Sequence, residues 1–389
     1  MPSLSPRATL ILVCTLYLAS GLTLASIGPN LATLATHSGQ DISVIGSLFT
    51  AFSLGTVLAQ LPAPWLTARY GQRAVLTLGI VMMGTGVLGE SLSRSLALLL
   101  SMGLLAGLGF GTILASGNLL VAQLFTHRST SVLNLINLFF GVGSIIGPLI
   151  TSWAKVSIGS SLAALWLGAG MFFLLAPVAT LVPVTTRSSS SVTDRATPPW
   201  GLIMLFGLLL LVYSGIEIAI GGWSTIYLNA STGMPLEQAA IAVSGFWLAL
   251  TIGRGIGSIL GLRLEAITLL RLAIGLLLAG TILLATSVGD VWRSVVALLI
   301  IGVASGPIFP SSLALIARIT QGQSSAIALT LAVANMGGAL IPPLIGMILR
   351  TSGPNVMATT LLLLSCTVVL LFGLVQFSRP AEAQRAPSA

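Results

Sequence analysis

The sequence predicts an all-α integral membrane protein with twelve transmembrane helices in two six-helix bundles related by pseudo-symmetry. Of the 389 residues, 55% are hydrophobic and only 6% are charged, with a mean hydropathy of +1.06. Soluble domains, by contrast, carry about a quarter charged residues. Apolar stretches of about 20 residues, the length that crosses a bilayer, recur along the whole chain. The two halves also resemble each other at a constant offset, which predicts the pseudo-symmetry.

The spans are predicted to be helices, because membrane barrels need alternating polar residues and runs such as LALLLSMGLLAGLGFGTILA (96–115) have none. Polar, Gly- and Pro-containing breaks divide each half into six spans. The spans of the first half lie near 8–36, 42–67, 74–91, 96–124, 130–153 and 160–182, and those of the second half near 200–228, 238–261, 268–288, 293–317, 325–349 and 357–377.

One long polar stretch, TRSSSSVTDRATPP (186–199), separates the two sets of spans and is typical of a flexible linker. The predicted organisation is therefore an N-terminal six-helix bundle at 1–185, a cytoplasmic linker at 186–199, and a C-terminal six-helix bundle with a short cytoplasmic tail at 200–389.

The internal repeat has an offset of 195 residues. GTILASGNLLVA (111–122) aligns with GPIFPSSLALIA (306–317), and IIGPLI (145–150) aligns with LIPPLI (340–345). A direct repeat of two six-helix halves joined by one linker is a pattern of secondary transporters.

The basic residues predict the orientation. With the N-terminus inside, eleven Lys and Arg residues fall on the cytoplasmic side and four fall outside: Arg94, Lys155, Arg293 and Arg350. This agrees with the positive-inside rule and predicts an inner-membrane (plasma-membrane) protein with both termini in the cytoplasm. The net charge of +8 is thereby attributed to orientation in the lipid bilayer, so no nucleic-acid partner is expected. A monomer is expected.

Elimination leaves one carboxylate for chemistry inside the membrane. Asp41, Glu90, Glu237 and Asp290 are predicted at outer helix ends or loops, and Asp194, Glu265 and Glu382 in the linker, an inner loop and the tail. Glu217 alone is predicted in mid-span. A carboxylate there is costly and is by default functional, and apolar surroundings favour its neutral form. Glu217 could exchange a proton, accept a hydrogen bond from a polyol, or hold a sodium ion; a structural helix–helix hydrogen bond is the alternative.

Five residues are predicted to bind substrate: Asn118, Asn137, Tyr213, Glu217 and Trp247. Tyr213 and Glu217 share one helix face, and amides suit hydroxyl-rich ligands because they both donate and accept hydrogen bonds. Interhelical hydrogen bonding explains Asn118 and Asn137 equally well. Arg254 is predicted near the cytoplasmic helix end, as a gate or helix cap rather than a substrate contact.

Enzyme chemistry and a resident cofactor or metal are not expected. The two histidines, His37 and His127, are predicted in loops, and the sequence contains no H-E-x-x-H and no G-x-S-x-G. Glycines spaced by four, Gly103, Gly107 and Gly111 and likewise Gly253, Gly257 and Gly261, predict close helix packing rather than a nucleotide-binding loop.

Several segments resemble the major facilitator superfamily, and in particular its fucose permease-like sugar symporter branch. They are LNLINLFFGVGSIIGPLI (133–150), YSGIEIAIGGW (213–223) and SGPIFPSSLALI (305–316). The resemblance implies the major facilitator fold, with spans 1, 4, 7 and 10 lining the centre. RYGQR (69–73) is similar to the superfamily's loop between helices 2 and 3, which implies gating roles for Arg69 and Arg73. Ala68 replaces that loop's usual acidic residue, and the branch's carboxylates on helices 1 and 4 are absent.

The leading hypothesis is a secondary active transporter that moves a sugar-like or small polar solute by alternating access, with proton coupling through Glu217. Sodium coupling and uniport remain open. The second hypothesis is a proton-coupled exporter of amphipathic drugs or metabolites, and the third is a ligand sensor that does not transport.

Overall fold

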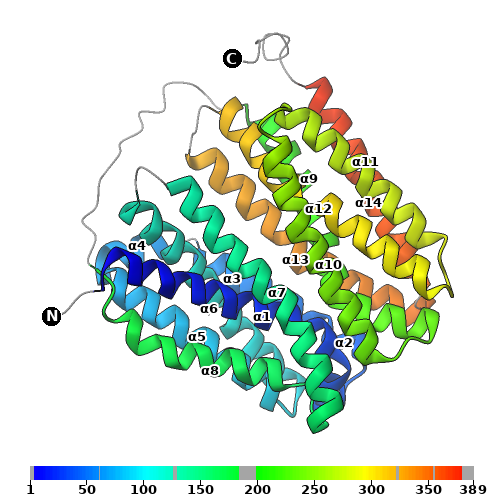
Figure 1. The fold of residues 1–389 in the computed structure, drawn as a ribbon, viewed down its shortest axis with the longest axis horizontal. Helices are drawn as coiled ribbons and strands as arrows, with labels where there is room; N and C mark the ends of the chain where they lie inside the picture. Colours follow the sequence, from blue (N-terminus) through cyan, green and yellow to red (C-terminus); the bar gives the residue numbers. More distant parts are fainter. Residues whose placement is uncertain are drawn as a thin grey trace. The chain divides into compact units, whose positions relative to one another are not determined.

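The computed structural model describes residues 4–60, 62–125, 129–183, 199–320, 324–353 and 355–378. These residues form helices and short connections and contain no strand (Figure 1). The first half holds α1 Pro6–Ser38, α2 Ile42–Ile45, α3 Ser47–Gln60, α4 Ala63–Tyr70, α5 Gln72–Leu92, α6 Leu96–Leu124, α7 Ser129–Ile158 and α8 Ala163–Ala179. The second half holds α9 Trp200–Thr232, α10 Leu236–Leu260, α11 Ala266–Ala285, α12 Val291–Ile319, α13 Ser324–Ser352 and α14 Val356–Phe377.

The predicted membrane spans correspond to these helices. Eleven helical segments in the described residues are long and apolar enough to cross a membrane, with α2 and α3 counted together as Ile42–Gln60. The apolar helix α8 has 17 residues and occupies the position of the sixth predicted span. The all-α membrane fold is thereby confirmed.

The second predicted span is shorter than expected. Its continuous helix was predicted over 42–67, but α3 ends at Gln60 and a separate helix, α4, begins at Ala63. Pro62 and Pro64 explain the break, because proline lacks the amide hydrogen that a continuing helix requires. The residues between Ala63 and Tyr70 therefore form a helix of their own before α5.

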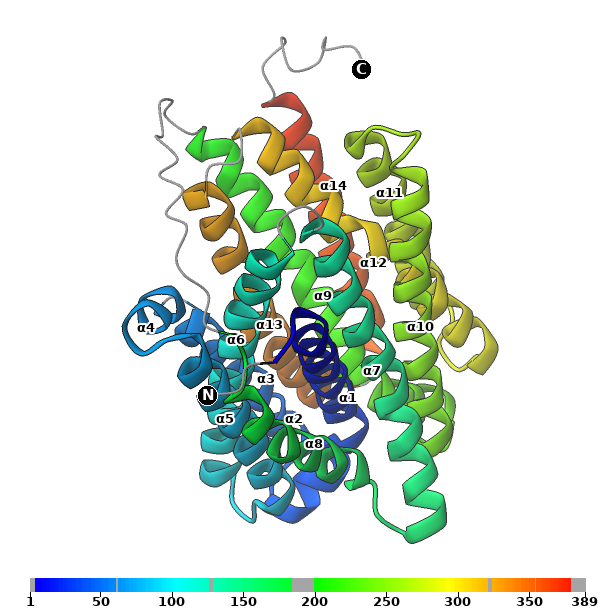
Figure 2. The same cartoon turned by 60° about the vertical axis from the view of Figure 1, so that its left-hand side comes forward.

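Contacts divide the chain into two compact units. Unit 1 comprises Met1–Ser188, Gly221–Asn229 and Pro235–Ser244, and unit 2 comprises Ser189–Ile220, Ala230–Met234 and Gly245–Ala389. In unit 1, α1 packs against α7 and α8, while α6 packs between α3 and α5 (Figure 2). In unit 2, α11 packs against α12 and α14. Most of the predicted linker lies outside the described residues, so its flexibility stays a prediction.

Glycines let pairs of helices in unit 1 approach to backbone contact. A Cβ on Gly143 of α7 would lie 2.0 Å from the carbonyl oxygen of Leu18 on α1. A Cβ on Gly107 of α6 would likewise lie 2.0 Å from the carbonyl oxygen of Phe52 on α3. Real Cβ atoms essentially never come so close, so these positions require glycine. The packing role predicted for Gly107 is confirmed.

Unit 2 repeats the same contacts between the corresponding helices. A Cβ on Gly337 of α13 would lie 2.0 Å from the carbonyl oxygen of Leu211 on α9, and one on Gly253 of α10 would lie 2.2 Å from that of Val303 on α12. Both ends of α12 also lie 195 residues after the ends of α6. The sequence offset thus corresponds to equivalent helices that use glycine in equivalent ways.

Candidate functional site

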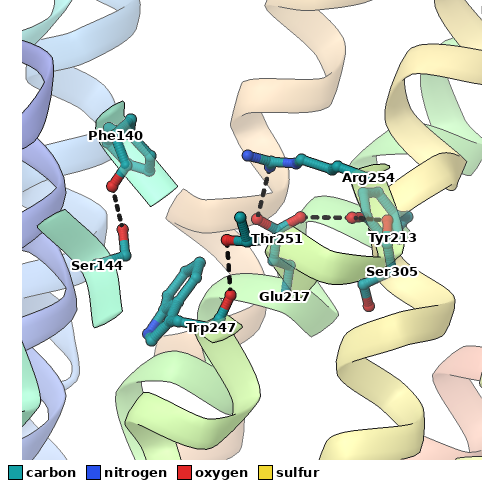
Figure 3. Close-up of polar contacts among 8 residues, drawn as sticks. All are labelled: Phe140, Ser144, Tyr213, Glu217, Trp247, Thr251, Arg254 and Ser305. Carbon is teal, nitrogen blue, oxygen red and sulfur yellow. Dashed lines mark hydrogen bonds and ion pairs between the residues drawn. The ribbon is translucent and has the colours of Figure 1, made fainter. Parts of the chain in front are cut away.

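The candidate site is built around Glu217 in the middle of α9. Tyr213 lies one turn earlier on the same helix face, is fully buried, and its hydroxyl donates a hydrogen bond of 2.5 Å to Glu217 Oε2 (Figure 3). The same hydroxyl lies 2.8 Å from the carbonyl oxygen of Ser305 on α12, which also accepts from it. Residues four apart on a helix are neighbours, so the predicted Tyr213–Glu217 face is what the structure uses. One tyrosine hydroxyl therefore serves two acceptors.

Arg254 of α10 forms an ion pair with Glu217. Its Nη2 lies 3.8 Å from Glu217 Oε1, and the side chains are 34% and 17% exposed, respectively. The sequence analysis treated Glu217 as an unpaired acid and placed Arg254 at a gate or helix cap. The pairing corrects that interpretation, because both residues belong to one charged cluster inside unit 2 (Figure 3).

The physical reason is the depth of the two residues along adjacent helices. Glu217 lies 15 residues before the end of α9 at Thr232, and Arg254 lies 18 residues after the start of α10 at Leu236. At a rise of about 1.5 Å per residue, the two Cα positions differ in depth by only about 4 to 5 Å. The long arginine side chain spans that difference.

Trp247 lies two turns before Arg254 on α10. Thr251, between them, donates its hydroxyl to the Trp247 carbonyl oxygen at 2.9 Å, and the Trp247 ring meets the Phe246 ring edge-on at a centroid distance of 5.3 Å. Two polar atoms of unit 2 are buried without a hydrogen-bond partner among the described residues, namely the indole Nε1 of Trp247 and the hydroxyl of Ser305. Buried polar groups normally have partners, so these two donors are available for a ligand.

The two predicted asparagines lie in unit 1. Asn118 Oδ1 on α6 accepts a hydrogen bond of 2.9 Å from the hydroxyl of Tyr17 on α1. Asn137 on α7 is exposed, and its amide donates to the Leu133 carbonyl oxygen of the same helix at 2.8 Å. Tyr17 is a partner that the sequence analysis missed, because the residue lies 101 positions away in an otherwise apolar helix. Substrate contact by either asparagine stays a prediction.

The two predicted gate arginines bind within unit 1. Arg69 is exposed on α4, with its guanidinium carbon 5.6 Å from the ring centres of both Trp65 and Tyr70. Arg73 Nε at the start of α5 donates to the carbonyl oxygen of Val182, which follows α8. Arg73 therefore links the start of one helix to the end of another, while Arg69 stacks on aromatic rings of its own helix.

The fold and this polar cluster define a polytopic membrane transporter. A sequence profile described as the Major Facilitator Superfamily matches residues 13–342. The chain belongs to this superfamily, whose members are transporters rather than enzymes.

Individual relatives are distant. The human sodium-dependent glucose transporter 1 is 23% identical over 384 residues, which cover 87% of this chain and 73% of that protein. A TsgA homolog of Serratia proteamaculans (strain 568) is 23% identical over 245 residues, 61% of each chain. This chain therefore spans about three-fifths of the length of the TsgA relative.

Solved structures share the fold. A variant of the nucleoside transporter NupG superposes with a TM-score of 0.78 at 12% identity, over 96% of this chain and 99% of that chain. A variant of the E. coli fucose:proton symporter FucP superposes with a TM-score of 0.65 at 17% identity, over 97% of this chain and 100% of that chain. The predicted likeness to fucose permease is confirmed at the level of the fold.

Proposed function

We propose that the chain is a secondary active transporter that moves a sugar-like or small polar solute by alternating access, coupled to a proton through Glu217. The observation that carries the proposal is the cluster of Glu217, Tyr213 and Arg254 in the middle of apolar helices. Ionisable groups at this depth are expensive and mark substrate or ion pathways. The partial exposure of Glu217 and Arg254 leaves both within reach of a solute or a proton.

The chemistry around the cluster suits a hydroxylated solute. Trp247 Nε1 and the Ser305 hydroxyl are buried donors without partners in the described part of unit 2, and Arg254 adds a charged donor. Sugars and nucleosides present ring hydroxyls that accept such hydrogen bonds, and aromatic rings such as Trp247 pack on their apolar faces. The names of the relatives fit this class: glucose, nucleoside and fucose are all hydroxylated ring compounds.

Tyr213 gives the proton a defined position. Its hydroxyl has one hydrogen but two acceptors, Glu217 Oε2 and the Ser305 carbonyl. When Glu217 is protonated, it donates to Tyr213, and Tyr213 donates to Ser305, so every atom is satisfied. Glu217 then has no charge to hold Arg254, and the guanidinium is free to bind the solute. Proton binding and solute binding would support each other in this way.

The same proposal includes the features that orientation and resemblance suggest. The chain would act as a monomer in the bacterial inner membrane with both termini in the cytoplasm, and Arg69 and Arg73 would contribute to the inner gate. Arg254 is reassigned from gating to the coupling cluster. Sodium coupling is the alternative favoured by the name of the human relative, and a drug exporter or a non-transporting sensor would be revealed by the experiment below.

The test is uptake by the purified chain in proteoliposomes, with a panel of sugars and nucleosides and with separate proton and sodium gradients. Glu217→Gln keeps shape and hydrogen bonding but cannot titrate. It should lose accumulation against a gradient yet retain solute exchange at equal concentrations. Glu265→Gln, the same change at an exposed position before α11, is the control and should behave as the wild type.

The outcomes separate the alternatives. Accumulation by Glu217→Gln at the wild-type level would rule out Glu217 as the coupling residue. Accumulation that follows only the sodium gradient would replace the proton with sodium. Drug-dependent proton release without sugar exchange would indicate an exporter, and solute binding without flux would indicate a sensor.

A further inference from the structure

Unit 1 holds a second carboxyl group that the sequence analysis assigned to an outer helix end or loop. Glu90 does lie near the end of α5, which ends at Leu92, but it is only 1% exposed. Neither carboxyl oxygen has a hydrogen-bond partner among the described residues. Sequence position gave the depth of Glu90 along the helix, but it did not reveal that the side chain points into the bundle.

The carboxyl group is enclosed where α3, α5 and α6 pack together. A Cβ placed on Gly103 of α6 would lie 3.5 Å from Glu90 Oε1 and 2.3 Å from Leu48 Cδ1 on α3. Leu48 is fully buried. The hydroxyls nearest in sequence are bound elsewhere, since Ser91 donates to the Leu88 carbonyl and Ser93 donates to the Gly89 carbonyl. Glycine and leucine thus form the surroundings of Glu90 Oε1.

Basic groups that could compensate a charge on Glu90 are absent from the helices packed against it. Within their described bounds, α3, α6 and α8 contain no Asp, Glu, His, Lys or Arg. The remaining charged or titratable groups on or beside neighbouring elements are Arg7 and His37 of α1, Asp41 before α2, Arg69 of α4, Arg73 of α5 and Arg94 after α5.

None of these groups contacts Glu90. Arg73 lies 17 residues away on the same helix, about 26 Å along its axis, and Arg7 and Arg69 lie on helix ends on that distant side. His37 is half-buried with Nδ1 unpartnered, and Arg94 is exposed. An unpaired carboxylate in an apolar interior costs far more than a neutral acid.

We propose that Glu90 is a proton-binding site that keeps the ends of α3, α5 and α6 packed only while it carries a proton. Loss of the proton would place an uncompensated charge against Gly103 and Leu48, and the three helix ends would have to separate to hydrate it. The charge distribution predicts this end of α5 on the outer side of the membrane, so the proton would be exchanged with the external medium. The site is distinct from Glu217, which lies in unit 2.

Linkage fixes the sign of the effect. The packed state binds a proton that the separated state releases above the ordinary carboxyl range, so packing weakens as pH rises, by up to tenfold in its equilibrium constant per pH unit for one proton. At acid pH both states are protonated and the effect disappears. A neutral replacement should therefore stabilise the chain at alkaline pH and leave it unchanged at acid pH.

The experiment compares thermal unfolding of the purified full-length chain in detergent between pH 5 and pH 9. Glu90→Gln should melt like the wild type at pH 5 and at a higher temperature at pH 8 to 9, and Glu90→Leu should show the same trend. The control Glu265→Gln should follow the wild-type curve throughout. Infrared spectra at pH 7 should show a protonated carboxyl band in the wild type that disappears in Glu90→Gln but persists in Glu217→Gln.

Two results would overturn the proposal. If both Glu90 variants melt below the wild type at every pH, the carboxylate is charged and stabilising. If the wild type and Glu90→Gln share one pH dependence and one infrared spectrum, no proton resides on Glu90. Neither readout involves solute transport, so the result is independent of the role proposed for Glu217.

Discussion

At the residue scale, the Tyr213 hydroxyl is the contact on which the candidate site depends. It has one hydrogen to donate, and it lies 2.5 Å from a Glu217 carboxyl oxygen and 2.8 Å from the Ser305 carbonyl oxygen. The number of satisfied hydrogen bonds therefore depends on whether Glu217 carries a proton. A residue in this position links a titration on α9 to the backbone of α12.

Tyr213→Phe should uncouple this link. The substitution leaves Glu217 Oε2 and the Ser305 carbonyl without their donor, which should cost about 1 to 3 kcal/mol of stability and should alter the pH dependence of proton-driven uptake. Tyr70→Phe removes a hydroxyl from an exposed tyrosine of α4 and is the control. Thermal unfolding and uptake measured across a pH series check both effects; an unchanged pH profile would show that the tyrosine has only a structural role.

The candidate site was predictable where it depends on one helix and unpredictable where it depends on two. Helical periodicity placed Tyr213 and Glu217 on one face. The Arg254 partnership depends on the relative depth of α9 and α10, which the sequence analysis did not compare. The burial of Glu90 depends on which face of α5 meets α6, and a short segment with small residues on several faces does not specify that.

At the element scale, glycines decide how closely helices pack. The contacts of α1 with α7 and of α9 with α13 bring a glycine within backbone contact of the facing helix, as Gly143 and Gly337 show. Between apolar helices in lipid, close packing replaces the hydrophobic effect as the main source of association. These pairs should therefore contribute a large share of the stability of each unit.

Gly143→Ala tests the contribution of one such contact. The added methyl group would lie 2.0 Å from the Leu18 carbonyl oxygen, so the helices must move apart, at a cost of about 1 to 3 kcal/mol or more. Gly170→Ala is the matched control, because nothing lies within 4 Å of its Cβ position on α8. That change should be neutral or stabilise the helix by up to about 1 kcal/mol. The measurement is thermal unfolding in detergent, and equal melting temperatures for the two variants would contradict the interpretation.

Helices were predictable to within a few residues, except where proline interrupted an apolar run. The prediction of 96–124 agrees with α6 at Leu96–Leu124, because polar residues mark both ends. The prediction of 42–67 failed because hydropathy stays high through the break at Pro62. Hydropathy measures partition into lipid, whereas helix continuity depends on backbone hydrogen bonds, and the two disagree at proline.

At the scale of the whole molecule, the distribution of charge predicts which side each loop faces. Eleven basic residues on one side against four on the other place the connection around Leu262 in the cytoplasm and the connection around Val288 outside. The overall architecture was predictable for the same reason: burial in lipid and charge at the boundaries act on whole spans and are summed over many residues.

Cysteine labelling checks this orientation. Cys14 and Cys366 would first be replaced by alanine, and Val288→Cys and Leu262→Cys would then be made separately at exposed positions. A membrane-impermeant maleimide should label Val288→Cys in intact cells and should label Leu262→Cys only after permeabilisation. The reverse pattern would invert the orientation and assign the Glu90 site to the cytoplasmic side.

The Glu217–Arg254 ion pair has a consequence for the response to membrane voltage. The pair carries no net charge, so a conformational change that moves it through the electric field does no electrical work. If Glu217 binds the coupling proton, the loaded form gains one positive charge, worth about 2.3 kcal/mol per 100 mV across the full field. A negative interior then drives the loaded step, and the return of the empty carrier is indifferent to voltage. Without Arg254, the empty carrier would return with the bare negative charge, so this arginine decides which half of the cycle the membrane potential drives.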